Sequence, residues 1–482
     1  MNNKYSPKKK DDFLGKYYTD ERSQWLVIIL GSSLILIMAL VIIIIDATTT
    51  NRIYQNEELL QGYIPLNSMT AKYIIDNSTE EILLFNKTYC KYIYMQKIDG
   101  NQIQNISNRY TFDSLGEHTM KIYLKKKLRS TNEFFLNCQN LIEVDLTNIT
   151  SQKIRTTADM FHGCYNLKNV VLSNFDSTNL KNISNMFYGY SSLNSINIIG
   201  FDGPQLEDIS GLFMKCTNLT DIYLNNFNTR NVINMSNLFY ECESLYELNL
   251  NSFLSFNTID MSNMFYGCSN LTSIEQSFTT TNVVYMNGMF DGCKSLFNLS
   301  IDNFDTQNVQ DMFFMFADCM SLTSIDISQF NTSNVTDMFG MFKNCVNLEY
   351  LNLSNLNIHN VYDMGDMFGN CSSLKEINLD NLDPKSLVYI AGMFENCSTL
   401  NNISMTNFSS SYLEDISYLF DGCSNLSYID LSSFNTSKIE KYEYIFRNIP
   451  ENGKIIYDSS LFNNSIINLL PESWEKIDIN EK

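Results

Sequence analysis

A phenylalanine recurs every 26 residues through most of this chain, and this period constrains the fold more than any other feature. A fixed period of this length means that each unit is one supersecondary element, which stacks on its neighbours because it cannot bury its apolar face alone. The interval shortens to 25 residues once, before Phe290, where Gln276 replaces an inward apolar residue. We expect a repeat array with a kink at that unit. The repeated residues are Phe135, Phe161, Phe187, Phe213, Phe239, Phe265, Phe290, Phe316, Phe342, Phe368, Phe394, Phe420 and Phe446.

Each unit combines two spacings, L-x2-I-x-L in its middle third and V-x2-M-x2-M at its end. The first spacing is that of leucine-rich repeats, in which a short strand with alternating side chains follows a turn. The second places Val335, Met338 and Met341 on one side of a helix or 3₁₀ turn. We therefore predict an α/β solenoid of about 12 rungs. At roughly 4.8 Å per strand, its parallel sheet would be on the order of 50–60 Å long.

Two segments display the unit clearly, Val232-Ile-Asn-Met-Ser-Asn-Leu-Phe239 and Ser262-Asn-Met-Phe265-Tyr-Gly-Cys268-Ser-Asn-Leu271-Thr-Ser-Ile274. Over about residues 130–447, the chain resembles the BspA-like (Treponema pallidum-type) leucine-rich-repeat proteins found on the surfaces of bacteria and several protists. The resemblance implies a cell-surface protein, of a kind often proposed to bind host or matrix proteins, without enzymatic activity in the repeats. It does not name a ligand.

A membrane segment is the second strong feature. The 21 residues from Trp25 to Ile45 carry no charge, and as a helix they would span about 30 Å, enough to cross a bilayer core. Basic residues dominate before this stretch, so the positive-inside rule places the amino terminus in the cytoplasm and the repeats outside. A cleaved signal peptide is the alternative, but its apolar region covers only about 7–15 residues. We expect a single-pass signal-anchor in the cell membrane.

The expected domain order follows from these two features. A solenoid exposes its core at both ends, so each end needs a cap. Alternating apolar residues predict strands at 72–75, 81–85, 92–96 and 119–124 in a small β domain, and at 454–457 after the repeats. The order is a tail at 1–24, the transmembrane helix at 25–45, a linker at 46–66, the β domain and N-terminal cap at 67–129, repeats at 130–447 and a C-terminal cap at 448–482.

The chain is acidic, with a net charge of −20. The tail at 1–24 has six basic and four acidic side chains and is therefore +2, which leaves −22 for the remainder. Such a surface repels phosphate groups, and this argues against nucleic acid and against anionic lipids as partners of the ectodomain. It would attract cations or basic partners, or serve only to keep the protein soluble.

Eleven of the twelve cysteines stand three places after a repeat phenylalanine, and only Cys90 lies outside this column. No C-x2-C pair occurs, so neither a disulfide framework nor a metal cluster is predicted. We expect small buried thiols, with disulfides between neighbouring rungs as the open alternative. The three histidines occupy unlike settings and no catalytic motif is present, so we expect no enzymatic activity and no cofactor.

The residues that alternate with the buried ones point outward, and they are the predicted binding surface. Tyrosine offers a large contact area and a hydroxyl group at low entropic cost, so we expect it to anchor a ligand. The ligand would be an extracellular protein or glycan, bound in adhesion or recognition. The alternative is a structural coat or spacer protein without a specific ligand. The candidate site residues are Tyr223, Tyr350, Tyr428, Asp145, Asp326, Glu247 and Asp430.

Several asparagines stand in the sequence N-x-S/T and are candidate glycosylation sites if the source is eukaryotic. Asparagine is so common in this chain that many such triplets arise by chance. The candidates are Asn77, Asn86, Asn334, Asn396 and Asn435.

Overall fold

The computed structural model describes residues 67–125, 127–197, 201–224, 227–276, 279–380, 382–408 and 410–481. The chain divides between residues 65 and 66, and residues 66–482 form one compact unit. The predicted tail, transmembrane helix at 25–45 and linker therefore lie outside the described residues. Within the ranges given above, no helix has the length and apolar character needed to cross a bilayer.

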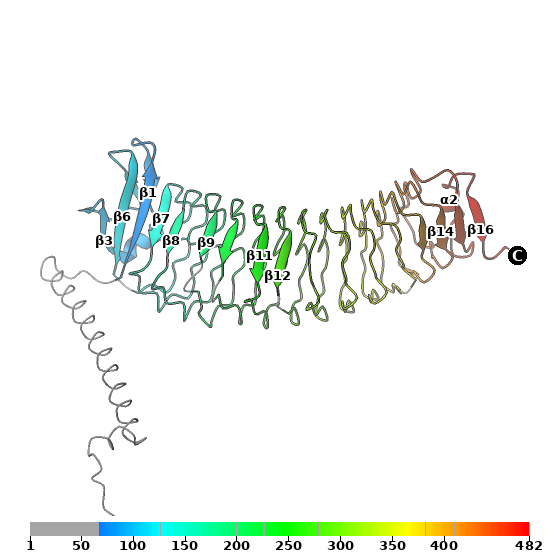
Figure 1. Ribbon diagram of the computed structural model, residues 1–482, viewed down its shortest axis with the longest axis horizontal. Helices are drawn as coiled ribbons and strands as arrows, with labels where there is room; N and C mark the ends of the chain where they lie inside the picture. Colours follow the sequence, from blue (N-terminus) through cyan, green and yellow to red (C-terminus); the bar gives the residue numbers. More distant parts are fainter. Residues whose placement is uncertain are drawn as a thin grey trace, which may run out of the picture. The chain divides into compact units, whose positions relative to one another are not determined.

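The N-terminal part is an antiparallel β domain whose strands continue into the repeats in the order β4-β3-β6-β1-β7-β8. Strand β1 (Ser68–Ile75) pairs with β6 (Gly116–Leu124) on one side and with β7 (Leu141–Asp145), the first repeat strand, on the other (Figure 1). It thereby covers an edge that would otherwise expose unpaired backbone groups. The other elements are β2 (Glu81–Leu83), η1 (Lys87–Tyr92), β3 (Ile93–Ile98), β4 (Asn101–Gln102) and β5 (Arg109–Thr111).

Among the described residues, seven of the following rungs add a short strand at the same phase of the repeat, and the positions of that phase together make the strand face. Figure 1 shows the rungs side by side in a curved row. The pairing is parallel, and residues 26 positions apart, such as Glu247 and Ser273, lie opposite each other. The strands are β8 (Asn169–Val171), β9 (Ser195–Asn197), β10 (Asp221–Tyr223), β11 (Glu247–Leu250), β12 (Ser273–Gln276), β13 (Asn402–Ser404) and β14 (Tyr428–Leu431).

The strand face is not the one long sheet that we predicted. Ladder pairing joins β9 to β10 and β11 to β12, but within the described part of the chain it does not join β8 to β9 or β10 to β11. Between β12 and β13 the described rungs are linked by single bridges such as Ser324 to Tyr350. The regular line of parallel bridges instead runs half a repeat away, from Ser130 through Thr156 and every later rung to Lys441.

The helices expected opposite the strands are absent from the described repeats, so the α/β part of the prediction is wrong and the array is a β-solenoid. Every repeat phenylalanine lies in a tight turn, with a left-handed residue two positions before it and another two positions after it. Around Phe135 these residues are Glu133 (φ 56°) and Asn137 (φ 60°). A right-handed helix cannot include such residues without cost. Here the N–H groups of both residues donate to carbonyls of the next rung.

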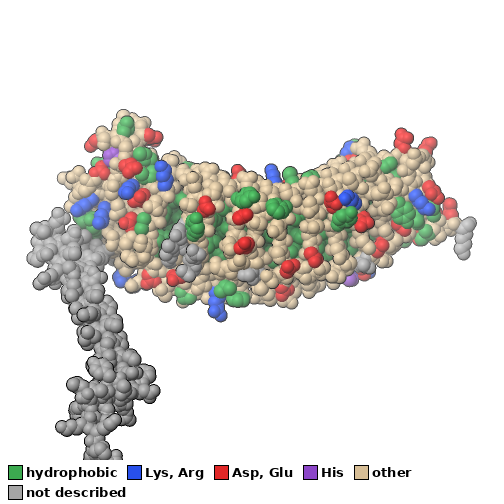
Figure 2. Space-filling view, in the orientation of Figure 1, with side chains coloured by type: hydrophobic (Ala, Val, Ile, Leu, Met, Phe, Trp, Pro, Cys, Tyr) green, Lys and Arg blue, Asp and Glu red, His purple; other side chains and the backbone are tan. Residues whose placement is uncertain are grey.

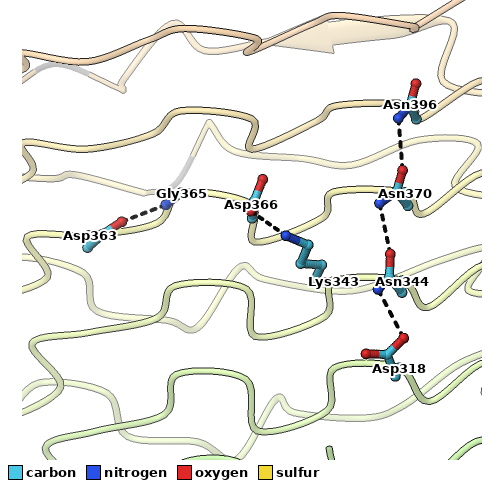
Figure 3. A network of polar contacts seen from close by, with 8 residues as sticks. All are labelled: Asp318, Lys343, Asn344, Asp363, Gly365, Asp366, Asn370 and Asn396. Carbon is cyan, nitrogen blue, oxygen red and sulfur yellow. Dashed lines mark hydrogen bonds and ion pairs between the residues drawn. The ribbon is translucent and has the colours of Figure 1, made fainter. Parts of the chain in front are cut away.

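Asparagine side chains extend this rung-to-rung bonding along the turns. Asn344, Asn370 and Asn396 occupy the left-handed position after the phenylalanine in successive rungs. The Asn370 amide donates to Asn344 and the Asn396 amide donates to Asn370, both at 2.8 Å, while Asn344 donates to Asp318 at 2.9 Å (Figure 3). The ladder satisfies amides that are part-buried at Asn344 and Asn370 and that would otherwise lose hydrogen bonds.

The phenylalanines form a continuous stack through the core. The ring centroids of all twelve neighbouring pairs lie 5.4–6.1 Å apart, and the planes are within 12° of parallel. Phe265 and Phe290, on either side of the short repeat, stack at 5.4 Å and 6°. The kink predicted there does not interrupt the stack. The one residue by which this repeat is shorter than the others is missing between Gln276 and Val283, outside the turn that contains the phenylalanine.

The cysteine column is explained by the same turns. All twelve cysteines are free, and the eleven in the column are buried. Ten of them donate a hydrogen bond from Sγ to the carbonyl oxygen of a phenylalanine in the preceding rung, at 2.9–3.3 Å, as Cys345 does to Phe316. The thiols are therefore packed donors and not disulfide partners. Tyr190 replaces the cysteine in one rung, and its ring lies edge-on to Phe187.

The C-terminal segment continues the array before it ends it. β15 (Lys454–Tyr457) matches the strand predicted at 454–457 and pairs in parallel with β14, and β16 (Glu475–Asp478) pairs with β15. The short helix α2 (Asn464–Ile467) connects them. Trp474 is buried, and its ring fills the space beside Gly453 that a side chain there would occupy.

Candidate functional site

The candidate site is an open hollow of about 820 Å³ on the strand face. It lies where β10 and β11 are not joined by ladder hydrogen bonds. Asp221 and Tyr223 come from β10, Glu247 from β11 and Glu275 from β12, because side chains at alternate strand positions point to the same face. The Glu275 carboxylate accepts a hydrogen bond from the Asn249 amide at 2.5 Å.

The hollow is acidic and contains an exposed aromatic ring. Three carboxylates on successive rungs line it, and its described lining residues include no basic side chain. Tyr223 is 52% exposed. An exposed tyrosine among carboxylates suits a ligand that presents cationic or hydrogen-bond-donating groups beside an apolar surface. Figure 2 shows red acidic side chains distributed along this side of the repeat array.

The hollow brings together only two of the seven residues that the sequence singled out, Tyr223 and Glu247. Tyr350 lies five rungs from Tyr223 and Tyr428 lies eight rungs away, which at about 4.8 Å per rung corresponds to roughly 24 and 38 Å. Tyr350 is 49% exposed, with the Lys375 ammonium 5.3 Å from its ring centroid. The Tyr428 hydroxyl donates to Asp430 at 3.4 Å. The three tyrosines are therefore separate features of one face.

The remaining predicted acids have a local structural role. Asp145, Asp326 and Asp430 each accept a hydrogen bond from the backbone N–H two residues later, at 2.8–3.0 Å. This contact fixes the turn that follows the strand. The hydrogen bonds from Ser328 lower the pKa of Asp326, because they stabilise its charged form.

Among the exposed aromatic residues that the sequence analysis missed, two directly precede strand-face positions. Tyr246 is 60% exposed and Phe297 is 62% exposed. Both stand one position before the first outward residue of their strands, Glu247 and Asn298. The signal was present in the sequence, since polar residues occupy most of that column and an aromatic residue there has no core to enter.

The glycosylation candidates differ in how their amides are used. The Asn334 amide donates to the Gln307 carbonyl at 2.7 Å and the Asn396 amide belongs to the ladder of Figure 3. The Asn86 amide donates to Glu133 at 3.4 Å. The side-chain oxygens of Asn77 and Asn435 accept backbone hydrogen bonds from Thr79 and Ser437.

The three histidines have separate surroundings. His118 is buried in β6, where Asp99 and the Ser114 carbonyl contact its two ring nitrogens at 2.7 and 2.9 Å. His162 stacks on Tyr188 at 4.1 Å. His359 is exposed and lies 3.4 Å from Asp383.

The fold and this face define a β-solenoid protein of the leucine-rich-repeat type. The chain belongs to the family described as "Mycoplasma protein of unknown function, DUF285", which matches residues 129–253, 259–378 and 370–466. A comparison with curated proteins found no match.

Two bacterial proteins are among the solved structures to which this chain is similar. A leucine rich cell surface protein from Faecalibacterium prausnitzii A2-165 is 18% identical, with a TM-score of 0.34, over 66% of this chain and 85% of the other. A leucine-rich repeat protein from Eubacterium ventriosum ATCC 27560 is 17% identical, with a TM-score of 0.26, over 51% of this chain and 82% of the other. A TLR13–ssRNA13 complex is 16% identical, with a TM-score of 0.23, over 64% of this chain and 49% of the other.

Proposed function

We propose that this protein is a membrane-anchored cell-surface protein of the BspA-like kind, which binds an extracellular protein or glycan through its strand face. The observation that carries the binding proposal is the hollow beside Tyr223, where an exposed aromatic ring lies among Asp221, Glu247 and Glu275. Its charge favours a ligand surface with basic or hydrogen-bond-donating groups. Catalysis and a cofactor form no part of the proposal.

The anchoring proposal is supported by the uncharged stretch from Trp25 to Ile45 and by the basic residues that precede it. Protease treatment of intact cells tests it. Loss of residues 66–482 to external protease, with an N-terminal tag protected inside, is the expected result. Protection of the repeats would contradict the proposed orientation.

The binding proposal is tested with the purified fragment 66–482, which forms a compact unit of its own. We expect saturable binding to cells or to extracellular matrix. The double variant Tyr223→Ala with Glu247→Gln should weaken this binding. The triple change of Tyr223, Tyr350 and Tyr428 to Ala shows whether the separated tyrosines contribute to it together. A matched control is Tyr412→Ala, which removes an exposed tyrosine outside the strands. Absence of saturable binding would support a structural coat or spacer role instead.

A further inference from the structure

A basic cluster lies at the N-terminal end of this acidic protein. Residues 121–155 contain seven basic and three acidic side chains, a local charge of +4, although the whole chain carries −20. Figure 2 shows several blue side chains over the N-terminal end of the array, with red ones among them. The net charge therefore does not describe every part of the surface.

Two adjoining hollows collect these charges. One is lined by Arg129, Gln152, Lys153, Arg155 and Asn179. The other includes Lys91, Lys127 and again Arg129. Among the described residues that line the two hollows, none is a carboxylate. Guanidinium, ammonium and amide groups around an open depression are the donors that recognise phosphate oxygens.

The stacking of rungs places the two arginines next to each other. The Arg155 N–H donates to the Arg129 carbonyl at 2.9 Å, and the Lys181 N–H donates to the Arg155 carbonyl at 2.7 Å. Lys181 forms an ion pair with Glu207. Among the ion pairs of the described residues, none includes Arg129, Lys153 or Arg155. Like charges one rung apart repel, and a bound anion between them would relieve the repulsion.

We propose that this basic cluster binds the phosphate-bearing headgroups of anionic membrane lipids. The chain enters the folded unit beside the cluster, because Asn67 accepts hydrogen bonds from the Leu124 and Thr150 N–H groups, both at 2.9 Å. Leu124 directly precedes Lys125, and Thr150 lies three residues before Lys153. The predicted linker at 46–66 ends at this point. Asn67, the first described residue after this linker, is thus hydrogen-bonded to segments that lead into the cluster.

This inference rests on the proposed membrane anchor, and it departs from the argument that an acidic ectodomain avoids anionic lipids. That argument used the net charge of the chain. Electrostatic interaction with a lipid surface decays within about 8–10 Å at physiological salt. The charged groups nearest the membrane therefore decide whether the protein is attracted or repelled. The carboxylates of the acidic strand-face hollow lie two to five rungs from Arg129 and Arg155.

Vesicle co-sedimentation of fragment 66–482 tests the proposal. We expect binding to phosphatidylcholine vesicles that contain phosphatidylglycerol and little binding to phosphatidylcholine alone. Arg129→Gln with Arg155→Gln should weaken binding by about tenfold or more, since each basic residue near an anionic surface contributes roughly a factor of five. Lys294→Gln with Lys476→Gln changes the net charge equally, outside the cluster, and should leave binding unchanged. Far-UV circular dichroism confirms that each variant is folded.

The outcomes separate the sources of phosphate. Equal binding to both vesicle types, or equal binding by the Arg129/Arg155 variant and the wild type, overturns the proposal. If inorganic phosphate stabilises the fragment against thermal unfolding but the fragment does not bind vesicles, the cluster binds a soluble anion. This result also overturns the proposal. Because the fragment lacks residues 1–65, its vesicle binding is measured independently of the anchor, whose failure appears only in the protease experiment on intact cells.

Discussion

At the scale of the residue, two side chains explain most of the repeat. The phenylalanine fills the core of each turn and stacks on the rings above and below it. The cysteine is small enough to fit behind the ring and donates its S–H to a phenylalanine carbonyl of the preceding rung. That carbonyl also accepts the backbone N–H of its own rung's cysteine, as Phe316 does from Cys319. Both lone pairs of this carbonyl oxygen thereby accept a hydrogen bond.

Removing one ring from the stack should be costly. Phe342 is fully buried between Phe316 and Phe368. We expect Phe342→Ala to lower the free energy of unfolding by about 3–5 kcal/mol, because the substitution leaves a cavity in a close-packed core. Phe297→Ala, at a side chain 62% exposed, should change it by less than about 0.5 kcal/mol. Urea denaturation followed by circular dichroism measures both, and similar losses would contradict the assignment of the stack as the core.

The column thiols should be unreactive in the folded protein. Burial raises the pKa of Cys164 and of Cys371 to about 12, so the nucleophilic thiolate is scarce at pH 8. Iodoacetamide should label only Cys90, which is partly exposed, and should label it slowly because burial raises its pKa as well. In urea all twelve cysteines should react. Mass spectrometry of labelled peptides reads the result, and rapid native labelling within the column would contradict it.

At the scale of the element, the tight turn around each phenylalanine decides the architecture. Its two left-handed residues bend the chain within one turn and direct N–H groups to the next rung. Gly, Asn and Asp occupy most of these positions, which they favour for conformational reasons. From the apolar spacing of the segment we predicted a helix or 3₁₀ turn, but the Gly and Asn residues two places after the phenylalanine were the contrary signal.

Substitutions of Asn370 distinguish the contribution of its side-chain hydrogen bonds from that of its left-handed backbone conformation. Its φ is 64°, and its amide bonds both to Asn344 and to Asn396. Asn370→Gly removes the hydrogen bonds but keeps the backbone conformation. Asn370→Ala loses both, and should be about 1 kcal/mol less stable than the glycine variant. Thermal denaturation of the pair measures the difference, and an alanine variant as stable as the glycine variant would exclude left-handed strain.

Asp291 makes one turn sensitive to pH. Burial, with repulsion from Asp318, raises the pKa of Asp291 to about 7. The folded state thus holds this proton more tightly than the unfolded state, so the stability it contributes is present below about pH 4 and is lost as the pH rises through 7. Asp291→Asn should be more stable than the wild type at pH 8 and equal to it near pH 4. Asp326→Asn, where the pKa is lowered, should destabilise the protein at pH 8.

At the scale of the whole molecule, the ends matter as much as the rungs. β1 covers the first strand by antiparallel pairing, and the last rungs are closed by β15, β16 and the buried Trp474. The N-terminal end is locally basic while the strand face is acidic. The proposed membrane and ligand surfaces are therefore separated along one solenoid.

Removing residues 448–482 should expose the apolar interior of the last rung. We expect the fragment 66–447 to self-associate, because an uncapped solenoid presents core residues and unpaired strand edges to solvent. Size-exclusion chromatography with light scattering compares it with fragment 66–482. A monomeric, fully folded 66–447 would show that the segment is not needed as a cap.

The sequence by itself determined the period, the number of rungs, the identity of the buried columns and the phase of the strands, because stacked repeats force equivalent residues into equivalent environments. It also predicted a membrane segment, which remains a prediction. Only the tertiary structure showed that turns replace helices, since apolar spacing alone does not specify backbone handedness. It alone showed that Arg129 and Arg155, one period apart, line a hollow together with Lys153, and that ladder pairing does not join β10 to β11, because the packing between neighbouring rungs depends on local backbone geometry that the period does not specify.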